Sequence, residues 1–85
     1  TIIDVREMDE FPEVNEFTNM RIPMSIFKNN LQSMANKNKL VIFCQTGLRS
    51  LKAANLLRAN FPGCTVYSLS GGIKAWKKYH QNISI

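Results

Sequence analysis

The sequence predicts an α/β domain whose strands form a parallel sheet with helices on both faces. Segments rich in β-branched residues alternate along the chain with segments whose apolar residues recur every three or four positions, and this alternation is typical of parallel sheets. The run LVIF at 40–43 is apolar without interruption, as expected of a strand covered on both faces. Because 85 residues suffice for one modest core, we expect a single domain over 1–85.

The first part of the chain predicts short elements. TIIDV at 1–5 is rich in β-branched residues and predicts a strand, whereas the acidic segment 6–17 predicts a surface turn with at most one short helix. MRIPM at 20–24 predicts a brief extended piece at a strand end or a sheet edge, because its proline has no N–H for a ladder hydrogen bond. Ser25 is expected to cap a helix whose apolar residues fall at helical spacing, namely Ile26, Phe27, Leu31 and Met34.

The rest of the chain predicts two further strands and two helices. The run at 40–43 is the first of these strands. The segment 50–61 predicts a helix that the following Pro-Gly pair stops, and its apolar face comprises Ala53, Ala54, Leu57 and Phe61. The segment 64–69 predicts the next strand, and a glycine turn then opens a helix with an apolar stripe of Ile73, Trp76 and Tyr79. Ligand sites in parallel sheets lie beyond the carboxyl ends of the strands, and Cys44 falls at such an end.

Charge is divided unevenly along the chain. All six acidic residues lie within the first 16 positions, and ten of the eleven Lys and Arg residues come after them. A site built after residue 17 is therefore expected to sit in a positive field and to bind an anionic substrate or an acidic partner surface. Nucleic acid is not expected as a partner, because the basic residues are scattered and no nucleic-acid-binding motif accompanies them.

Composition also bears on the setting of the protein. No apolar stretch approaches the length of a membrane span, so no membrane partner is expected. The chain has no initiator Met and opens directly on a strand, so we expect it to be a piece of a longer protein. Two cysteines favour a reducing, cytoplasmic setting, although their spacing alone leaves a disulfide open. With a single histidine, no metal site is expected, and no cofactor is implied.

The loop after Cys44 combines a cysteine, a glycine and an arginine ahead of a helix expected to begin near Ser50. Gly47 permits backbone angles that align successive N–H groups, and the helix N-terminus adds partial positive charge. With Arg49 as a fixed cation, such an anion cradle lowers the pKa of a thiol from about 8.5 by up to several units. Cys44 is therefore a candidate nucleophile that needs no histidine base.

A buried, inert cysteine is the alternative for this position, because free cysteines are often interior. For Cys44 the Thr-Gly-x-Arg-Ser sequence at the start of a helix favours the reactive interpretation. Cys64 follows a Pro-Gly pair and has neither a cationic neighbour nor a glycine loop. We expect Cys64 to be structural.

Four segments resemble, in order, the signatures of a rhodanese-like sulfurtransferase domain: IDVRE at 3–7, RIPMS at 21–25, VIFCQTGLRS at 41–50 and LSGGIKAW at 69–76. The resemblance covers nearly the whole chain. In its cysteine loop, and in lacking the Gly-His-Ile-Pro-Gly-Ala segment common in the family, the chain is similar to the C-terminal rhodanese domain of adenylating enzymes of molybdopterin and thiamine biosynthesis. The resemblance implies a rhodanese-like α/β fold that lacks the family's first strand.

The resemblance also implies a persulfide mechanism. Cys44 would accept a sulfane sulfur from thiosulfate or a protein persulfide and pass it to a thiophilic acceptor. Asp4 and Arg6 would tie the first strand to neighbouring loops, with a simple surface ion pair as the open alternative. The expected partners are an anionic sulfur donor, a cysteine desulfurase, a sulfur-carrier protein and an adenylation domain of the parent chain. The substrate cradle would be the backbone of Gln45, Thr46, Gly47, Leu48, Arg49 and Ser50.

Two other functions compete with sulfur transfer. Cysteine-based phosphatases and arsenate reductases of related fold also place a cysteine, a loop and an arginine around an oxyanion, but their loops have five intervening residues, whereas four separate Cys44 from Arg49. Such a phosphatase also needs a general acid, and no Asp or Glu follows residue 17. The second competitor is a noncatalytic docking module of the same family, which could keep the cysteine and the arginine.

Overall fold

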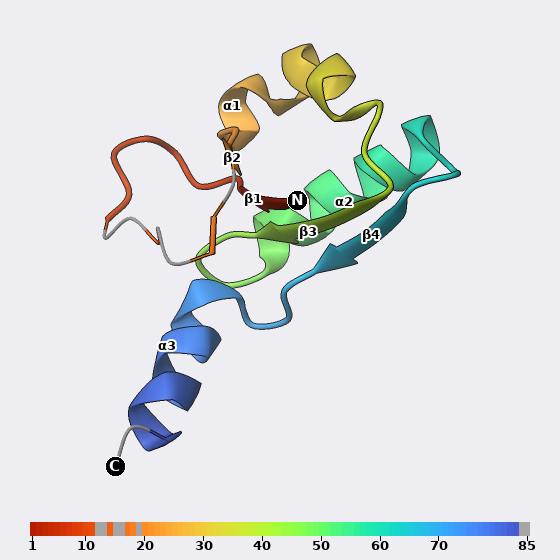
Figure 1. The fold of residues 1–85 in the computed structure, drawn as a ribbon. Coiled ribbons are helices and arrows are strands. Elements are labelled where there is room, and N and C mark those ends of the chain that lie inside the picture. Colours follow the sequence, from red (N-terminus) through yellow and green to blue (C-terminus); the bar gives the residue numbers. More distant parts are fainter. Residues whose placement is uncertain (12–13, 15–16, 19, 84–85) are drawn as a thin grey trace.

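The computed structural model describes residues 1–11, 14, 17–18 and 20–83, of which 79–83 are described by their backbone alone (Figure 1). Part of the acidic turn expected over 6–17, and the side chain of Tyr79, therefore lie outside the described residues. The elements, in chain order, are β1 (Ile2–Asp4), β2 (Met20–Arg21), α1 (Met24–Phe27), the 3-10 helix η1 (Lys28–Met34), β3 (Lys39–Phe43), α2 (Leu48–Asn60), β4 (Thr65–Ser68) and α3 (Gly72–Ile83).

The four strands form one parallel sheet in the order β2-β1-β3-β4. Asp4 lies opposite Phe43, and Ile42 lies opposite Ser68, so the carboxyl ends of β1, β3 and β4 meet at the same edge. The predicted parallel sheet is confirmed. A further strand ahead of Thr1 stays a prediction.

Helices cover both faces of the sheet, as predicted. On one face, α1, η1 and α2 bury residues such as Phe27, Met34 and Leu57 against the strands. On the other face, Ile73 of α3 packs with Phe43 of β3, and Trp76 of the same helix contacts the ring of Phe17 at a centroid distance of 5.1 Å. Burial of these apolar side chains on both faces is the main source of stability for a sheet of this size.

The helix expected after Ser25 differs from its prediction. Pro23 is the N-cap of α1, and Ser25 lies inside the first turn, where its N–H and hydroxyl bind the Glu7 carboxylate. The helix then tightens into η1, and Asn30, which has non-helical backbone angles, donates its side-chain amide to the carbonyl of Ile26. A side chain that competes for backbone groups in this way interrupts a regular helix. The prediction that Ser25 caps this helix is therefore wrong. Ile26, one of the apolar residues expected at helical spacing, is 47% exposed.

The helix α2 begins at Leu48, two residues before the expected start near Ser50. Its N-cap is Gly47, whose φ of +99° lies in the left-handed region and turns the chain sharply into the helix. Ala53, Ala54 and Leu57 are buried, as the period predicted. Among the described residues, no helix combines the length and apolar character that crossing a membrane requires.

Candidate active site

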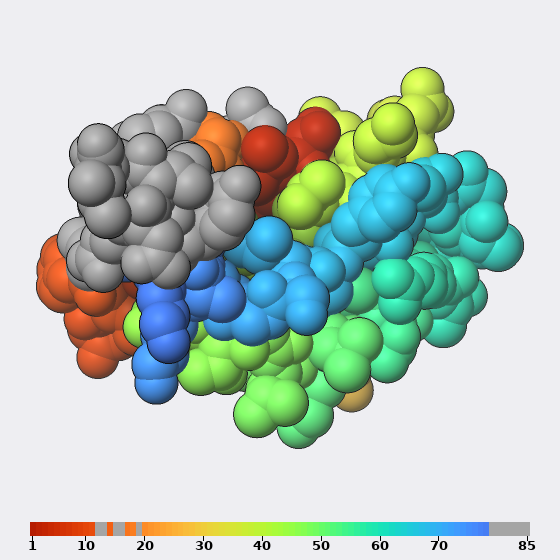
Figure 2. Space-filling view, turned by 90° about the horizontal axis from the view of Figure 1, so that it is seen from below, coloured from red at the N-terminus to blue at the C-terminus, as the bar shows by residue number. Residues whose placement is uncertain are grey.

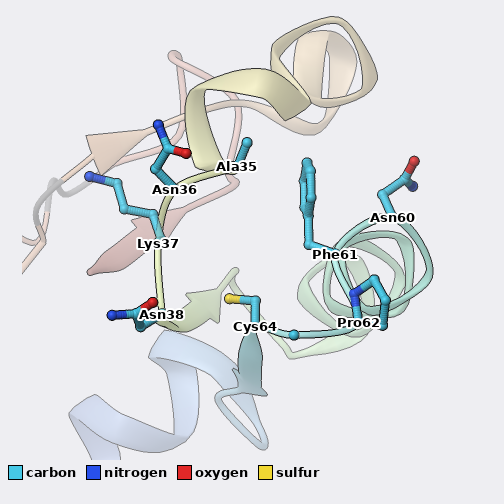
Figure 3. A pocket seen from close by; sticks show the side chains of 9 residues that line it. Ala35, Asn36, Lys37, Asn38, Asn60, Phe61, Pro62 and Cys64 are labelled. Atoms are coloured by element: carbon cyan, nitrogen blue, oxygen red, sulfur yellow. The ribbon is translucent and has the colours of Figure 1, made fainter.

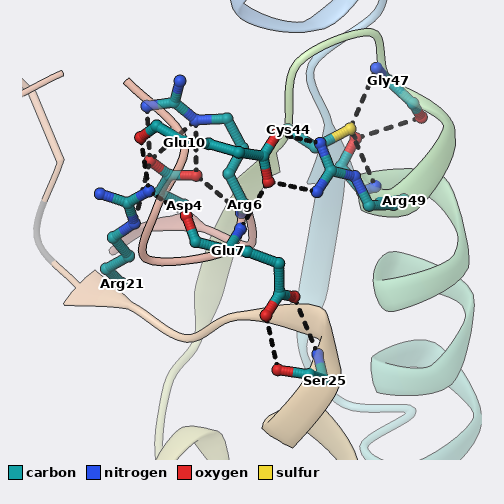
Figure 4. Close-up of polar contacts among 10 residues, drawn as sticks. Asp4, Arg6, Glu7, Glu10, Arg21, Ser25, Cys44, Gly47 and Arg49 are labelled. Atoms are coloured by element: carbon teal, nitrogen blue, oxygen red, sulfur yellow. Dashed lines mark hydrogen bonds and ion pairs between the residues drawn. The ribbon is translucent and has the colours of Figure 1, made fainter. Parts of the chain in front are cut away.

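Cys44 lies directly after β3, at the carboxyl edge of the sheet. Its side chain is 0% exposed and belongs to the larger apolar core. Its Sγ nevertheless accepts hydrogen bonds from the backbone N–H of Gly47 at 3.1 Å and of Ser50 at 3.3 Å (Figure 4). The sulfur therefore sits in a ring of amides at the N-terminus of α2, and both cysteines of the chain are free thiols.

The surroundings favour the thiolate form of Cys44. Burial by itself raises the pKa of the thiol, but the hydroxyl of Ser50 and the amides of Ser50, Gly47 and Thr46 stabilise the anion and hold the pKa below its usual value. The Ser50 hydroxyl lies 3.6 Å from Sγ. A thiolate fraction at neutral pH is what a cysteine nucleophile requires.

The first turn of α3 holds the loop in this shape. Ile73 donates its N–H to the carbonyl of Cys44 at 2.9 Å, and Lys74 donates to the carbonyl of Gln45 at 3.0 Å. These two bonds hold the start of the loop against α3, and the amides of Gly47 and Ser50 further along the loop donate to the sulfur. Gly72 makes this contact possible: its φ is +64°, and a Cβ there would lie 2.5 Å from each of the two carbonyl oxygens. Sequence reasoning identified the two glycines as a turn and missed this supporting role.

Arg49 takes a different place from the one expected. Its two Nη atoms donate to the Glu10 carboxylate at 2.5 and 2.7 Å (Figure 4). This hydrogen bonding lowers the pKa of Glu10 to about 2 and raises that of Arg49. The expected positive field is reduced at this point, because the fold brings an acid 39 residues away in sequence onto the loop arginine.

The remaining loop residues contribute in different ways. Ser50 is buried next to the sulfur, and Gln45 is half-buried. Thr46 is exposed and contributes its amide, whereas the side chain of Leu48 is 72% exposed and points away from the core. The expected cradle is thus built from backbone groups of the loop, with the side chain of Ser50 added.

Asp4 and Arg6 form a buried ion pair, so the alternative of a surface pair does not hold. Arg6 donates to both carboxylate oxygens of Asp4, with an Nη2–Oδ2 distance of 3.0 Å, and the two side chains are 0 and 2% exposed. Arg21 of β2 lies 3.9 Å from the same carboxylate and donates to the carbonyls of Glu7 and Glu10. This network fastens the segment that carries Glu10 to β1 and β2. Glu10 stood in no motif of the sequence, and Arg21, although it opens the RIPMS segment, was given no role there.

Figure 2 shows three of these parts on one side of the molecule: the orange-red acidic segment, the yellow-green loop after Cys44 and the blue start of α3. The bonds Glu10–Arg49 and Ile73–Cys44 join them in pairs. The candidate site is therefore assembled from segments that are far apart in sequence.

Cys64 lies at the opposite, amino-terminal end of the sheet. It is half-buried beside an open depression of about 520 Å³ lined by residues 35–38 and 60–64 (Figure 3). Its Sγ has only a weak contact, 3.8 Å to the carbonyl of Thr65. Within the described part of the chain, no backbone N–H donates to this sulfur as the amides do at Cys44, although Lys37 lines the same depression. In the described part of the chain, no three His, Cys, Asp or Glu side chains are grouped as metal ligands.

This fold and cysteine loop are those of a rhodanese-like domain, and the chain belongs to that family, whose model matches residues 1–79. An uncharacterized protein of Bacillus subtilis, YqhL, is 38% identical over 76 residues, which are 88% of this chain and 59% of that protein. The thiosulfate sulfurtransferase GlpE of Coxiella burnetii is 28% identical over 93% of this chain and 73% of its own length. A solved rhodanese-related protein from Thermoplasma volcanium superposes with a TM-score of 0.78 at 27% identity, over 93% of this chain and 77% of its own.

Proposed function

We propose that the protein is a sulfurtransferase in which Cys44 carries the transferred sulfur as a persulfide. The observation that carries the proposal is the pair of amide hydrogen bonds to Sγ at the N-terminus of α2. These bonds favour the thiolate, which is the nucleophile that takes up the sulfur. The similarity to a thiosulfate sulfurtransferase over 93% of this chain supports the same reaction class.

The reaction with thiosulfate proceeds in two displacements. The Cys44 thiolate attacks the outer sulfur of thiosulfate, the S–S bond of the donor breaks, and sulfite leaves with the bonding electron pair. The enzyme then carries a Cys–S–S⁻ group. An acceptor nucleophile such as cyanide attacks the terminal sulfur, leaves as thiocyanate, and restores the thiolate. Neither step needs a histidine base, which suits a site with no histidine among its described side chains.

Loop length separates this function from phosphate chemistry, because four residues lie between Cys44 and Arg49, whereas the phosphatase pattern has five. The contact of Arg49 with Glu10 does not distinguish the two functions, because thiosulfate and phosphate are both oxyanions. The docking function has no specific observation in its favour, because an ionisable sulfur in an amide ring is not needed for docking alone. Sulfur transfer therefore accounts for more of the site than either alternative.

The partners belong to the proposal as well. A protein persulfide such as that of a cysteine desulfurase could supply the sulfur, and a sulfur-carrier protein activated by an adenylation domain could receive it. A cytoplasmic setting, which the two cysteines favour, and a role in molybdopterin or thiamine biosynthesis, which the resemblance to the adenylating enzymes implies, stay predictions.

The test is turnover of thiosulfate and cyanide to thiocyanate. We expect the wild-type protein to form thiocyanate and Cys44→Ser to lose this activity completely. Cys64→Ser is the matched control and is expected to retain it. Mass spectrometry after incubation with thiosulfate alone should find one additional sulfur on the peptide that contains Cys44.

Three results would contradict the proposal. An inactive wild type that forms no persulfide would favour the docking module. Aryl phosphate hydrolysis faster than thiocyanate formation would favour the phosphatase. An additional sulfur found on Cys64 would move the reaction to the other end of the sheet.

A further inference from the structure

A second serine hydroxyl stands behind Ser50. Ser68 is the last residue of β4 and is half-buried, and its Oγ lies 2.8 Å from the Oγ of Ser50. The pairing of Ser68 with Ile42 sets it at the carboxyl edge of the sheet, beside the strand that Cys44 directly follows. The two hydroxyls and the sulfur therefore form a continuous chain from Cys44 through Ser50 to Ser68.

The hydrogen bonds of Ser50 cannot all be donated. Its hydroxyl has one proton and three neighbours: the carbonyl of Gly47 at 3.2 Å, Ser68 Oγ at 2.8 Å and Cys44 Sγ at 3.6 Å. When Cys44 is a thiol, its S–H can donate to Ser50, and Ser50 can donate to the Gly47 carbonyl. When Cys44 is ionised, the sulfur can only accept, so the proton of Ser50 is best placed toward it.

The direction of the bond between the two serines decides which arrangement is favoured. If Ser68 donates to Ser50, an oxygen lone pair of Ser50 is occupied, and the Ser50 proton is left for the sulfur or for the Gly47 carbonyl, of which the ionised sulfur attracts it more strongly. If Ser68 accepts instead, the Ser50 proton is diverted from the sulfur. A hydroxyl in a chain of this kind also becomes a stronger donor when it accepts a hydrogen bond.

We propose that Ser68 is a positioning residue that donates its hydroxyl proton to Ser50 and thereby keeps the Ser50 hydroxyl directed at the Cys44 sulfur. Its importance for turnover rests on the proposed sulfur transfer, but its effect on the thiol does not. Ser68 touches neither the sulfur nor a substrate in this arrangement. It acts only through Ser50.

The charged groups nearest the sulfur belong to residues that a substitution of Ser68 does not replace. The loop and α2 contribute Arg49 together with its partner Glu10. From α3 the neighbouring titratable side chain is that of Lys74, which is exposed, and β1 ends in the buried Asp4–Arg6 pair. Ser68 brings no charge of its own, so its effect on the thiol is a hydrogen-bond effect.

The experiment compares Ser68→Thr with Ser68→Val in a Cys64→Ser background, where Cys44 is the only thiol. Thr and Val have nearly the same shape and both suit a strand, but only Thr keeps the hydroxyl. The rate of alkylation by iodoacetamide is measured from pH 5 to 10. We expect Ser68→Thr to follow the parent profile and Ser68→Val to react about three- to tenfold more slowly near pH 7, the size expected for one hydrogen bond.

Ser70→Ala is the control for the turn, because Ser70 is exposed two residues further along the chain. It is expected to leave the profile unchanged. Equal profiles for the Thr and Val variants would overturn the positioning role, and so would a shift in Ser70→Ala as large as that in Ser68→Val. Thermal unfolding of each variant shows whether the Thr and Val proteins are equally folded at the assay temperature.

The outcome is separable from that of the proposed function, because alkylation needs no sulfur donor. A Thr–Val difference in a protein that transfers no sulfur would support the positioning role while the sulfurtransferase proposal falls. Sulfur transfer with identical Thr and Val profiles would overturn the positioning role alone.

Discussion

At Cys44, burial and polar contact occur together. A cysteine at the end of an apolar strand usually behaves as a small hydrophobic residue, and this one is indeed part of the core. The difference lies at the sulfur, which meets the amides of Gly47 and Ser50 rather than aliphatic carbon on one side. A substitution of a polar neighbour of this sulfur is therefore expected to alter the ionisation of the Cys44 thiol more than the packing of the Cys44 side chain.

Gly72 is the residue whose replacement is expected to damage the site most directly. A Cβ there would lie 2.5 Å from the carbonyl oxygens of Cys44 and Gln45, and the φ of +64° strains any L side chain. Gly72→Ala should lower the free energy of unfolding by about 2 to 4 kcal/mol. Urea titration followed by tryptophan fluorescence gives this value.

Gly63→Ala is the matched control for that substitution, because a Cβ at Gly63 meets nothing within 4 Å. Its free energy of unfolding is expected to stay within about 0.5 kcal/mol of that of the wild type. Equal losses of unfolding free energy for Gly63→Ala and Gly72→Ala would mean that the close contact of Gly72 with the loop carbonyls is not the cause of the destabilisation.

At the scale of elements, α2 connects the core to the site. Its middle buries Ala53, Ala54 and Leu57 against the sheet, and its first turn supplies the amide of Ser50 to the sulfur. The helix axis therefore fixes the position of that amide relative to β3. Loosening the buried face of α2 is expected to affect both stability and the thiol.

Two leucines of α2 test this arrangement. Leu57 is fully buried, so Leu57→Ala should cost about 2 to 5 kcal/mol of unfolding free energy. Leu51 is 48% exposed, and Leu51→Ala should cost about 0.5 kcal/mol or less. Chemical denaturation of the two variants side by side measures the difference, and similar losses would contradict the assigned orientation of the helix.

At the scale of the whole molecule, the acidic N-terminal segment neutralises part of the basic remainder. Asp4 pairs with Arg6 and lies near Arg21, and Glu10 pairs with Arg49. These contacts span all the strands on one side of β3 and end at the cysteine loop. The acidic residues near the N-terminus thus form ion pairs with arginines, one of them far along the chain, and these pairs hold distant segments together.

A fall in pH should weaken the ion pair between Glu10 and Arg49 within a defined pH range. The pKa of Glu10 falls from an ordinary 4.5 to about 2 in the folded protein, so the pair with Arg49 stabilises the fold above pH 4.5, and this contribution is lost as the pH falls toward 2. Because both side chains are about one-third exposed, the stabilisation is about 1 kcal/mol or less.

Glu10→Gln should therefore be slightly less stable than the wild type at pH 7 and show a flatter stability profile between pH 5 and 2. Asp9→Asn, which removes an exposed acid from the same segment, serves as the control and is expected to match the wild type at pH 7. Thermal unfolding across this pH range measures both. A wild-type profile no steeper than that of Glu10→Gln would contradict the ion-pair contribution.

The sequence by itself determined the succession of strands and helices along the chain, the parallel character of the sheet and the position of the cysteine loop at a strand end. These follow from apolar periodicity and from residues that are neighbours in the chain, such as Gly47 beside Cys44. Small local effects, such as the side-chain bond of Asn30, shifted the ends of elements because they compete with backbone hydrogen bonds of similar strength.

Only the tertiary structure decided how the site is completed. The bond from Arg49 to Glu10 joins residues 39 apart, and the bond from Ser50 to Ser68 joins residues 18 apart. Such contacts depend on strand order and register, which place distant side chains at one edge of the sheet, and no local pattern encodes them. The arginine predicted for the substrate therefore faces an acid, and a serine that no motif marked stands behind the nucleophile.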